Sequence, residues 1–251
     1  PAMLQAMDAT FDPSLDTSSL RVLSSGAAPV PLPLLERFHE LGIDIVQAYG
    51  LTEAGGAVSV LDAADAVTHL GSAGKALLSL ELRIEDEDGN ELPPGEPGEI
   101  VLRLDRGDPC GLFQGYYRDE EHSREAREGG VYHTGDLAWR DEDGYYWYVG
   151  RRDDVIKSSG YRIGPFEIEN VIMELPYVLE CGVSAAPDEV RGQIIKASVV
   201  LTKGTAGTEE LKREIQEYVK THTAPYKYPR IVEFREDLPK TISGKIMRRL
   251  L

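Results

Sequence analysis

The chain has 251 residues, 41% of them hydrophobic, and can therefore bury a substantial core in one large or two smaller domains. Its formal net charge of −16 argues against a nucleic-acid-binding or anionic-membrane-binding surface, because either would need a basic stripe. Two cysteines, Cys110 and Cys181, are too few for a disulfide framework and have no metal-ligand spacing.

The first 70 residues have the pattern of a strand–helix–strand unit. Short apolar runs predict strands over Leu20–Ser24 and Ile43–Ala48, and apolar residues at helical spacing predict a helix over Leu32–Leu41. This order favours a parallel sheet, in which ligands bind at the carboxyl ends of the strands. We therefore expect residues 1–70 to form part of a larger α/β domain.

Residues 71–152 have shorter apolar runs separated by turn residues. The pattern predicts strands over Glu81–Glu85 and Glu99–Leu104 and a hairpin over Leu137–Val149. The alternation within the hairpin favours an antiparallel β subdomain. Trp147 and the tyrosines beside it are interpreted as packing residues of this subdomain.

The charge balance changes at Gly150. Residues 1–150 hold 10 Lys and Arg against 28 Asp and Glu, whereas residues 151–251 hold 17 against 15. Residues 153–251 are predicted to form an α+β lid domain from the helices and strands Pro165–Glu174, Glu180–Ala185, Ile194–Thr202, Thr208–Thr221 and Ile231–Phe234. The expected fold class is α/β and α+β: a partial large domain, made of the strand–helix–strand piece and the antiparallel β subdomain, followed by a small mobile domain.

The segment Leu238–Lys245 has the composition of a loop that carries one exposed lysine to an anionic reaction centre. Pro239 fixes the entry of the loop, and Gly244 allows the backbone to come close to a ligand. Lys245 is a mobile positive charge, suited to a phosphoryl oxygen whose negative charge grows in a transition state. Taken alone, the segment also fits a solvated lysine near a chain end.

Four further segments suited to phosphates and nucleotides precede the lysine loop in a fixed order: Ser25–Pro29, Tyr49–Glu53, Tyr132–Asp136 and Gly150–Arg162. With these motifs the sequence resembles the AMP-forming adenylating enzymes, the superfamily of acyl-CoA synthetases, luciferases and peptide-synthetase adenylation domains. Two runs resemble the medium-chain acyl-CoA synthetases most, namely Ile156–Glu167 and Thr223–Arg230. Five ordered motifs are far more specific than any one of them.

The resemblance implies a nucleotide site in the first part of the chain. In it, Tyr49 would stack on adenine beside the flexible Gly50, Thr52 would touch the α-phosphate and Glu53 would hold Mg²⁺. One carboxylate is sufficient, because Mg²⁺ usually takes one or two from the protein and otherwise binds water or phosphate oxygens. The alternative is a strand-to-helix turn with a solvated Glu53. The resemblance also assigns the adenine wall to four small residues, Gly26, Ala27, Ala28 and Pro29.

Asp136 follows the flexible Gly135 and, as an ionised carboxylate, can accept both hydroxyls of a ribose. The resemblance gives Asp136 this role and implies that Arg151 is a second contact to the ribose or a phosphate. His133 suggests acid–base catalysis, but carboxylate adenylation needs no general base, since the nucleophile is already ionised at neutral pH. We therefore interpret His133 as a structural residue.

The segment Arg151–Arg162 is the expected joint between the two parts. The resemblance implies that Asp153 is the hinge of a rotating carboxyl-terminal domain, which presents different groups to one site in turn. In one orientation Lys245 and Arg162 would stabilise the charge on the reacting phosphates. In the other, Ser159 and Gly160 would form the wall of the pantetheine channel. The alternative is a charged interdomain loop.

The sequence departs from the family at its start. The family has a Ser/Thr/Gly-rich loop that grips the β- and γ-phosphates of ATP, and nothing in residues 1–23 matches it. We therefore expect the chain to be the carboxyl-terminal half of an enzyme of roughly double length, whose missing amino-terminal half is its partner and holds most of the acyl pocket. The chain alone is expected not to form acyl-CoA.

The resemblance favours an acid–thiol ligase, an AMP-forming acyl-CoA synthetase for medium-chain or short-chain fatty acids or aromatic acids. Its substrates and cofactors would be a carboxylic acid, ATP with AMP as product, Mg²⁺ and coenzyme A. The alternatives are an amino-acid or aryl-acid adenylation domain that loads a carrier protein, and a truncated nucleotide-binding or interaction module. No apolar run reaches the roughly 18 residues of a membrane span, so we expect no integral membrane segment and a cytoplasmic location.

Overall fold

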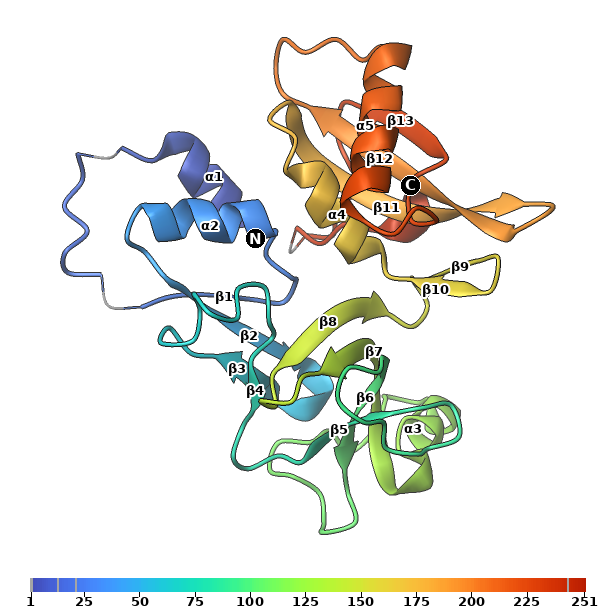
Figure 1. Ribbon diagram of the computed structural model, residues 1–251. Helices are drawn as coiled ribbons and strands as arrows, with labels where there is room; N and C mark the ends of the chain where they lie inside the picture. The colour runs from blue at the N-terminus through green and yellow to red at the C-terminus, as the bar shows by residue number, and fades with distance from the viewer. Residues whose placement is uncertain (1, 13, 21, 243) are drawn as a thin grey trace. The chain divides into compact units, whose positions relative to one another are not determined.

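The computed structural model describes residues 2–12, 14–20, 22–242 and 244–251. The contacts within the chain divide it into two compact units, Pro1–Arg152 (unit 1) and Asp153–Leu251 (unit 2), both drawn in Figure 1. Among the described residues, unit 1 contains two four-stranded sheets and unit 2 contains one five-stranded sheet. This mixed architecture confirms the predicted α/β and α+β fold class.

The first sheet of unit 1 has the strand order β1-β2-β3-β4. The elements around it are α1 (Ala2–Thr10), β1 (Leu23–Gly26), α2 (Leu32–Glu40), β2 (Ile45–Leu51), the short 3₁₀ helix η1 (Thr52–Ala54), β3 (Gly56–Leu61) and β4 (Lys75–Ala76). β1 and β2 are parallel, as the strand–helix–strand pattern predicts. β3 then returns antiparallel to β2, a strand that the sequence pattern did not predict.

β1 begins later than the strand predicted over Leu20–Ser24. The N–H of Leu20 donates to the carbonyl of Thr17 at 2.9 Å, so Leu20 lies in a turn, and Arg21 is outside the described residues. In the parallel ladder Gly26 is the partner of Ala48. The shift brings Gly26 to the carboxyl end of β1, beside the last residues of β2.

Helix α2 has the predicted extent to within one residue and packs through its apolar stripe. Leu34, Leu35 and Phe38 are buried together with Ile43 and Ile45, because residues three and four apart lie on one face of a helix. Full burial of each such side chain contributes about 1.5–3 kcal/mol. This cluster fixes the strand–helix–strand unit that carries β1 and β2 to the site.

The second sheet of unit 1 is antiparallel throughout, as predicted, in the order β5-β6-β7-β8. Its elements are β5 (Leu82–Glu85), β6 (Gly98–Arg103), α3 (Glu120–Glu125), the 3₁₀ helix η2 (Glu128–Gly130), β7 (Val131–Arg140) and β8 (Tyr146–Arg151). The predicted hairpin joins β7 to β8. Its turn is held by Asp141 Oδ1, which accepts hydrogen bonds from the N–H groups of Asp143 and Tyr145 at 3.1 and 2.8 Å.

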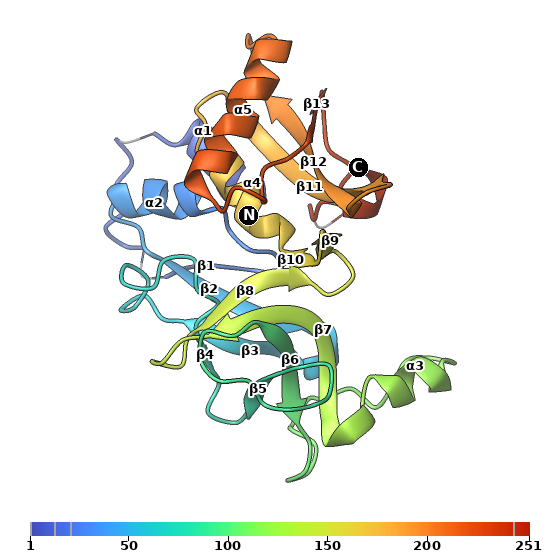
Figure 2. The ribbon, with the colours of Figure 1, turned by 45° about the vertical axis from the view of Figure 1, so that its right-hand side comes forward.

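Unit 2 contains one sheet with two helices on one face (Figure 2). Its elements are β9 (Ile156–Ser158), β10 (Tyr161–Ile163), α4 (Pro165–Met173), β11 (Val178–Asp188), β12 (Gly192–Leu201), α5 (Glu209–His222), β13 (Ile231–Arg235) and the 3₁₀ helix η3 (Arg248–Leu250). Thr208 begins α5 as predicted, and its side chain accepts a hydrogen bond from Leu211 N–H at 3.2 Å. The small hairpin of β9 and β10 was not predicted.

The other face of this sheet is covered by the carboxyl-terminal segment. A side chain on Gly182 would meet Leu251 Cδ1 at 2.8 Å and Ile246 Cγ2 at 3.2 Å, so this glycine makes room for the segment. Leu238 is buried in the same place. The lysine loop therefore starts and ends on residues that are packed against β11.

Candidate functional site

The strand ends of the first sheet meet at the segments predicted to hold adenine. Gly26 ends β1, and a Cβ on it would lie 3.0 Å from the carbonyl oxygen of Ala48. Ala27 follows in the left-handed region with φ of 70° and is exposed, while Ala28 and Pro29 are half-buried. Four small residues thus leave the sheet beside the end of β2.

Gly50 is needed for the close approach of two strands. A Cβ at this position would lie 2.1 Å from the carbonyl oxygen of Gly56, well inside van der Waals contact, and the β2–β3 ladder changes register between Tyr49 and Gly50. The strand continues into η1, where Thr52 is exposed and Glu53 is half-buried. The segment after β2, for which the alternative was a strand-to-helix turn with a solvated Glu53, is a short 3₁₀ helix in which Glu53 is half-buried.

Tyr49 and Asp136 bring the two sheets of unit 1 together. The Tyr49 hydroxyl donates to Asp136 Oδ2 at 2.7 Å, and the Tyr148 hydroxyl donates to Oδ1 at 3.3 Å. Arg151 forms an ion pair with Oδ1 at 3.5 Å and also donates to the Thr134 carbonyl at 3.0 Å. Three of the residues selected from the sequence, namely Tyr49, Asp136 and Arg151, thus form one cluster.

Burial controls the electrostatics of this cluster. Burial raises the pKa of Asp136, although the hydrogen bond from Tyr49 and the charge of Arg151 act in the opposite direction. Burial, reinforced by the Asp136 charge, also raises the pKa of Tyr49, so the phenol stays a donor. The Asp136 carboxylate can accept hydrogen bonds from further hydroxyls. Its partial removal from water disfavours its negative charge.

Tyr148 is a site residue that the sequence interpretation missed. Its ring lies 6.2 Å from that of Tyr49, measured between centroids, and its hydroxyl reaches Asp136. The interpretation of the β8 tyrosines as packing residues overlooked this bond. The predicted hairpin contained the signal, because it places Tyr148 on the strand next to Asp136.

Glu53 lies in a second polar cluster with an aromatic wall. Its backbone carbonyl accepts from Phe113 N–H at 2.7 Å, and its Oε1 accepts from the Tyr116 hydroxyl at 3.3 Å. Burial and the Glu53 charge together raise the pKa of Tyr116. No group of three or more His, Cys, Asp or Glu side chains in the described part of the chain is placed to hold a metal. Glu53 fits a Mg²⁺ ion only as one carboxylate among water and phosphate ligands.

His133 precedes Gly135 and Asp136 on β7 and pairs with Glu99, a residue that sequence reasoning missed. Its Nδ1 lies 3.2 Å from Glu99 Oε2, and the hydrogen bond to Glu99 raises the pKa of the imidazole. Glu99 Oε1 also accepts from Gly135 N–H at 2.9 Å. The structural role interpreted for His133 agrees with this pairing.

Unit 2 holds the remaining predicted residues. Asp153 is exposed at the start of the unit, and Arg162 is exposed on β10, opposite Lys157 of β9. Ser159 and Gly160 form the turn between these strands, at φ of 50° and 84°. A left-handed pair in the turn is what allows two short strands to reverse within two residues.

The lysine loop is a tight reversal held by its own backbone. Lys240 bridges to Ile246, the N–H of Thr241 donates to the Lys245 carbonyl at 2.8 Å, and Gly244 has φ of 81°. Lys240 Nζ is held by Glu180 at 2.6 Å. Lys245 itself is exposed and forms no ion pair with any residue that the structure describes, whereas Ser243 lies outside the described residues. The loop presents the Lys245 ammonium to solvent.

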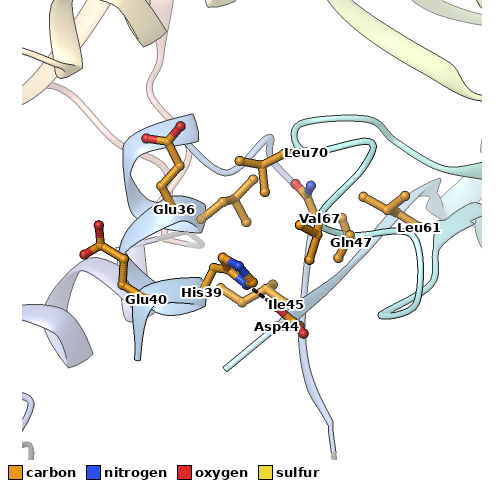
Figure 3. A pocket seen from close by; sticks show the side chains of 11 residues that line it. Glu36, His39, Glu40, Asp44, Ile45, Gln47, Leu61, Val67 and Leu70 are labelled. Carbon is orange, nitrogen blue, oxygen red and sulfur yellow. Dashed lines mark hydrogen bonds and ion pairs between the residues drawn. The ribbon is translucent and has the colours of Figure 1, made fainter. Parts of the chain in front are cut away.

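A cavity of about 290 Å³ lies elsewhere in unit 1 (Figure 3). It is bordered by α2, β2 and the segment before β4, and the figure shows His39 and Asp44 at its rim, joined at 2.8 Å. None of the residues selected from the sequence lines it. The candidate site is therefore the polar surface around Asp136 and Glu53 rather than this cavity.

Both units match known protein families. Residues 1–117 match the family described as AMP-binding enzyme, and residues 167–245 match the AMP-binding enzyme C-terminal domain. The chain is 44% identical over 236 residues to the human acyl-coenzyme A synthetase ACSM4, mitochondrial. The match covers 93% of this chain and 40% of that protein. The chain thus spans about 40% of the length of the curated relatives it matches.

Solved structures show the same similarity. The anthranilate CoA ligase AuaEII in complex with anthranoyl-AMP aligns with a TM-score of 0.88 at 34% identity, over 98% of this chain and 47% of that chain. The o-succinylbenzoate CoA synthetase MenE from Bacillus subtilis, in complex with ATP and magnesium ion, aligns with a TM-score of 0.84 at 34% identity, over 100% and 50%. In the described part of the chain, every helix is too short or too polar to span a membrane.

Proposed function

The chain belongs to the family of AMP-binding enzymes, the AMP-forming adenylating superfamily, and from this premise we propose that it is part of an ATP-dependent acyl-CoA ligase. Such an enzyme joins a carboxylate to the α-phosphorus of ATP with release of pyrophosphate. The thiol of coenzyme A then attacks the acyl carbonyl, and AMP leaves. The acid is proposed to be a medium-chain or short-chain fatty acid or an aromatic acid.

The observation that carries the proposal is the cluster of Tyr49 on β2, Asp136 in the middle of β7 and Arg151 at the end of β8. It combines a buried carboxylate with an aromatic ring, whose hydroxyl lies 2.7 Å from the carboxylate, and a guanidinium 3.5 Å from it. A ribose needs an acceptor for its hydroxyls, and an adenine needs a flat surface. We assign Asp136 to the ribose, Tyr49 to the base and Arg151 to the ribose or a phosphate.

The small residues at the end of β1 and the residues of η1 complete the proposed nucleotide site. Gly50 admits β3 and so fixes the end of β2, where Thr52 is assigned to the α-phosphate and Glu53 to Mg²⁺. A Mg²⁺ ion held there together with phosphate oxygens would neutralise charge that develops during phosphoryl chemistry. The adenine wall is assigned to the four residues Gly26, Ala27, Ala28 and Pro29.

Unit 2 is proposed to supply the groups that differ between the two half-reactions. Lys245 and Arg162 are assigned to the charge on the reacting phosphates during adenylation, and Ser159 and Gly160 to the pantetheine arm during thioester formation. Asp153 is proposed as the hinge. The exposed ammonium of Lys245 supports this assignment, because it forms no ion pair with any described residue and is open to a phosphate oxygen.

The test begins with the nucleotide. AMP titrated into the chain and followed by calorimetry should bind, and Asp136→Ala should weaken the affinity at least about tenfold, as expected for lost charge-assisted hydrogen bonds. The matched control is Asp143→Ala, an exposed carboxylate in the β7–β8 turn, which should leave the affinity unchanged. Equal affinity of all three proteins would overturn the assignment of the ribose site.

The second arm tests the chemistry in a protein that joins this sequence to the remaining part present in its relatives. Lys245→Ala should lower carboxylate-dependent ATP–pyrophosphate exchange by about 10²–10³ and spare thioester formation from supplied acyl-adenylate. Lys203→Ala, in an exposed loop, is the control. Equal loss of both half-reactions would refute the division of labour, and enzyme-like exchange by the chain alone would contradict its expected inactivity.

Two finer points stay predictions. Thioester formation with free coenzyme A, rather than with a carrier protein, would separate the ligase from an amino-acid or aryl-acid adenylation domain. The cytoplasmic location expected from the sequence also stays a prediction, since the curated relatives are named as mitochondrial proteins. Fractionation of cells that express the tagged protein would decide it.

A further inference from the structure

The Gly135-Asp136 turn is a bulge in the β6–β7 ladder. Glu99 pairs with Leu137 and Val101 pairs with His133, so the three residues Thr134–Asp136 lie opposite Ile100 alone. The backbone ladder cannot bond all of them, and a bulge of this kind bends the strand and turns a side chain to a new direction. Here the bend turns toward Tyr49 and Tyr148, which donate to Asp136.

Side chains replace the lost ladder bonds at the bulge. Glu99 Oε1 accepts from Gly135 N–H at 2.9 Å. Thr134 Oγ1 donates to the Ile100 carbonyl at 2.7 Å and accepts from Asp136 N–H at 3.1 Å. Gly135 has φ of 70°, a left-handed conformation that favours glycine, and a Cβ there would lie 3.0 Å from Arg151 Nη2. Glu99 thus supplies a charged acceptor for a backbone N–H of the bulge.

The second oxygen of Glu99 reaches the end of unit 1. Oε2 accepts from Arg152 Nη1 at 3.4 Å and lies 3.2 Å from His133 Nδ1. The backbone of Arg152 also contacts the bulge, because its N–H donates to the Gly135 carbonyl at 2.8 Å. One carboxylate, with a side chain 11% exposed, thus joins the Asp136 turn to the residue that precedes Asp153.

The charges around Glu99 keep it ionised. Burial raises the pKa of Glu99, but the His133 and Gly135 hydrogen bonds and the Arg152 charge outweigh burial and hold the pKa below its ordinary value. The groups that act on His133 are Glu99 on β6, Glu85 on β5 and the backbone of Glu128 before β7. An ionised acceptor makes the stronger bond to a backbone N–H.

We propose that Glu99 is a positioning residue that holds the Gly135-Asp136 bulge in the orientation that receives the ribose, and that anchors Arg152 beside the proposed hinge. The inference rests on the proposed function for its ligand, but its structural core is the bond to Gly135. Truncation of Glu99 would leave the Gly135 N–H without its acceptor in a bulge that offers no backbone alternative. Asp136 would then lose its fixed direction toward the nucleotide.

The experiment combines amide NMR with AMP titration of the 251-residue chain. Glu99→Ala should speed hydrogen exchange of the Gly135 amide at least about tenfold, the rate change that a loss of about 1.4 kcal/mol in local opening would give, and should weaken AMP binding by a similar factor. Glu99→Gln keeps a carbonyl acceptor and should restore most of both. Glu85→Ala, a buried carboxylate on the neighbouring strand, is the matched control and should change neither.

The outcomes separate the inference from the function on which it rests. If the unaltered chain binds no AMP, the proposed nucleotide site fails, and the Gly135 amide alone still decides the role of Glu99. Should Glu99→Ala fail to fold, the Gly135 proton shift decides it: that shift should follow the acid titration of Glu99 in the unaltered chain and not in Glu99→Gln. Unchanged Gly135 exchange in Glu99→Ala, an absent titration, or equal effects of Glu85→Ala would overturn the proposal.

Discussion

The hydroxyl of Tyr49 lies 2.7 Å from Asp136 Oδ2, although 87 positions separate the two residues and they belong to different sheets. Tyr148 and Arg151 add their contacts to the same carboxylate. The proposed ribose acceptor therefore also joins the two sheets of unit 1. A change at either residue should be visible in stability as well as in nucleotide binding.

Tyr49→Phe should destabilise unit 1 by about 1–3 kcal/mol, because it removes a donor from a buried acceptor while keeping the ring. The loss should appear as a lower midpoint in urea unfolding with an unchanged denaturant slope. Tyr148→Phe is the comparison, since its hydroxyl makes the longer bond of 3.3 Å, and its effect should be smaller. An effect of Tyr148→Phe larger than that of Tyr49→Phe would contradict this ranking.

Asp136→Asn should stabilise the chain at neutral pH while it weakens nucleotide binding. Burial raises the pKa of Asp136, so folding favours the protonated form, and this contribution is lost as the pH rises through the folded pKa. A neutral amide of the same shape avoids the buried charge and still accepts from Tyr49. The expected gain is on the order of 1 kcal/mol, or about 2–4 °C in Tm.

The pH dependence of this gain is its check. Thermal unfolding of both proteins between pH 7 and pH 4 should show the difference shrinking as the pH approaches 3.8, the ordinary pKa of aspartic acid. A lower Tm of Asp136→Asn at pH 7 would show that Arg151 and the tyrosines overcompensate burial. Function would then not oppose stability at this site.

The strands and helices whose apolar residues follow a clear period could be predicted from the sequence. Helix α2 and the β7–β8 hairpin follow from local apolar spacing and turn residues. β3 and the β9–β10 hairpin could not, because their pairing depends on partners in the folded chain and their runs are short. The predicted position of β1 was wrong for a related reason. Its four residues, Leu23–Gly26, form a strand because they pair with β2.

The residues of the candidate site were found through motif order, and their contacts were not. Tyr49 and Asp136 stand in motifs that the family resemblance singles out, whereas Glu99 stands in none of the five. Its role depends on a two-residue surplus in β7 relative to β6, which fixes where the Gly135 N–H points. A register irregularity of this kind leaves no periodic signal in the sequence, so Glu99 could be found only from the structure.

His133 should make the stability of unit 1 depend on pH. The hydrogen bond to Glu99 raises the pKa of His133, so its contribution is fully present below the ordinary value of about 6.5 and is lost as the pH rises through the folded pKa. The difference in unfolding free energy between the unaltered chain and His133→Asn should therefore be largest near pH 6 and smallest near pH 9. Chemical denaturation at several pH values measures it.

His122 supplies the control for this titration. It pairs with Asp119, which precedes α3, at 2.7 Å, and that bond also raises the pKa of His122, but both side chains are exposed. Exposed pairs contribute little to stability, so His122→Asn should give a nearly flat difference over the same pH range. Equal pH profiles for the two variants would show that burial of Glu99 has no influence on the His133 pair.

Among the arginines of unit 2, replacement of Arg248 by alanine should lower the free energy of unfolding most, because Arg248 neutralises a buried carboxylate. Its guanidinium donates to both oxygens of Glu169, at 2.7 Å to Oε2 and 3.0 Å to Oε1, and reaches Asp154 Oδ2 at 3.3 Å. Glu169 is buried on α4 and accepts from Val183 N–H at 2.8 Å. Arg248→Ala would leave the buried Glu169 carboxylate without its positive partner and should lower the free energy of unfolding by about 3–5 kcal/mol.

Two further variants separate a stranded charge from lost packing. Arg249→Ala, at the exposed neighbouring position, should cost less than about 0.5 kcal/mol. Adding Glu169→Gln to Arg248→Ala should recover part of the loss, because the neutral amide still accepts from Val183 and no charge is left buried. Urea unfolding that showed the double variant no more stable than Arg248→Ala would place the cost in packing. Arg248 also joins Asp154, next to the proposed hinge, to Glu169 of α4, so these variants measure how much this tie contributes to the stability of unit 2.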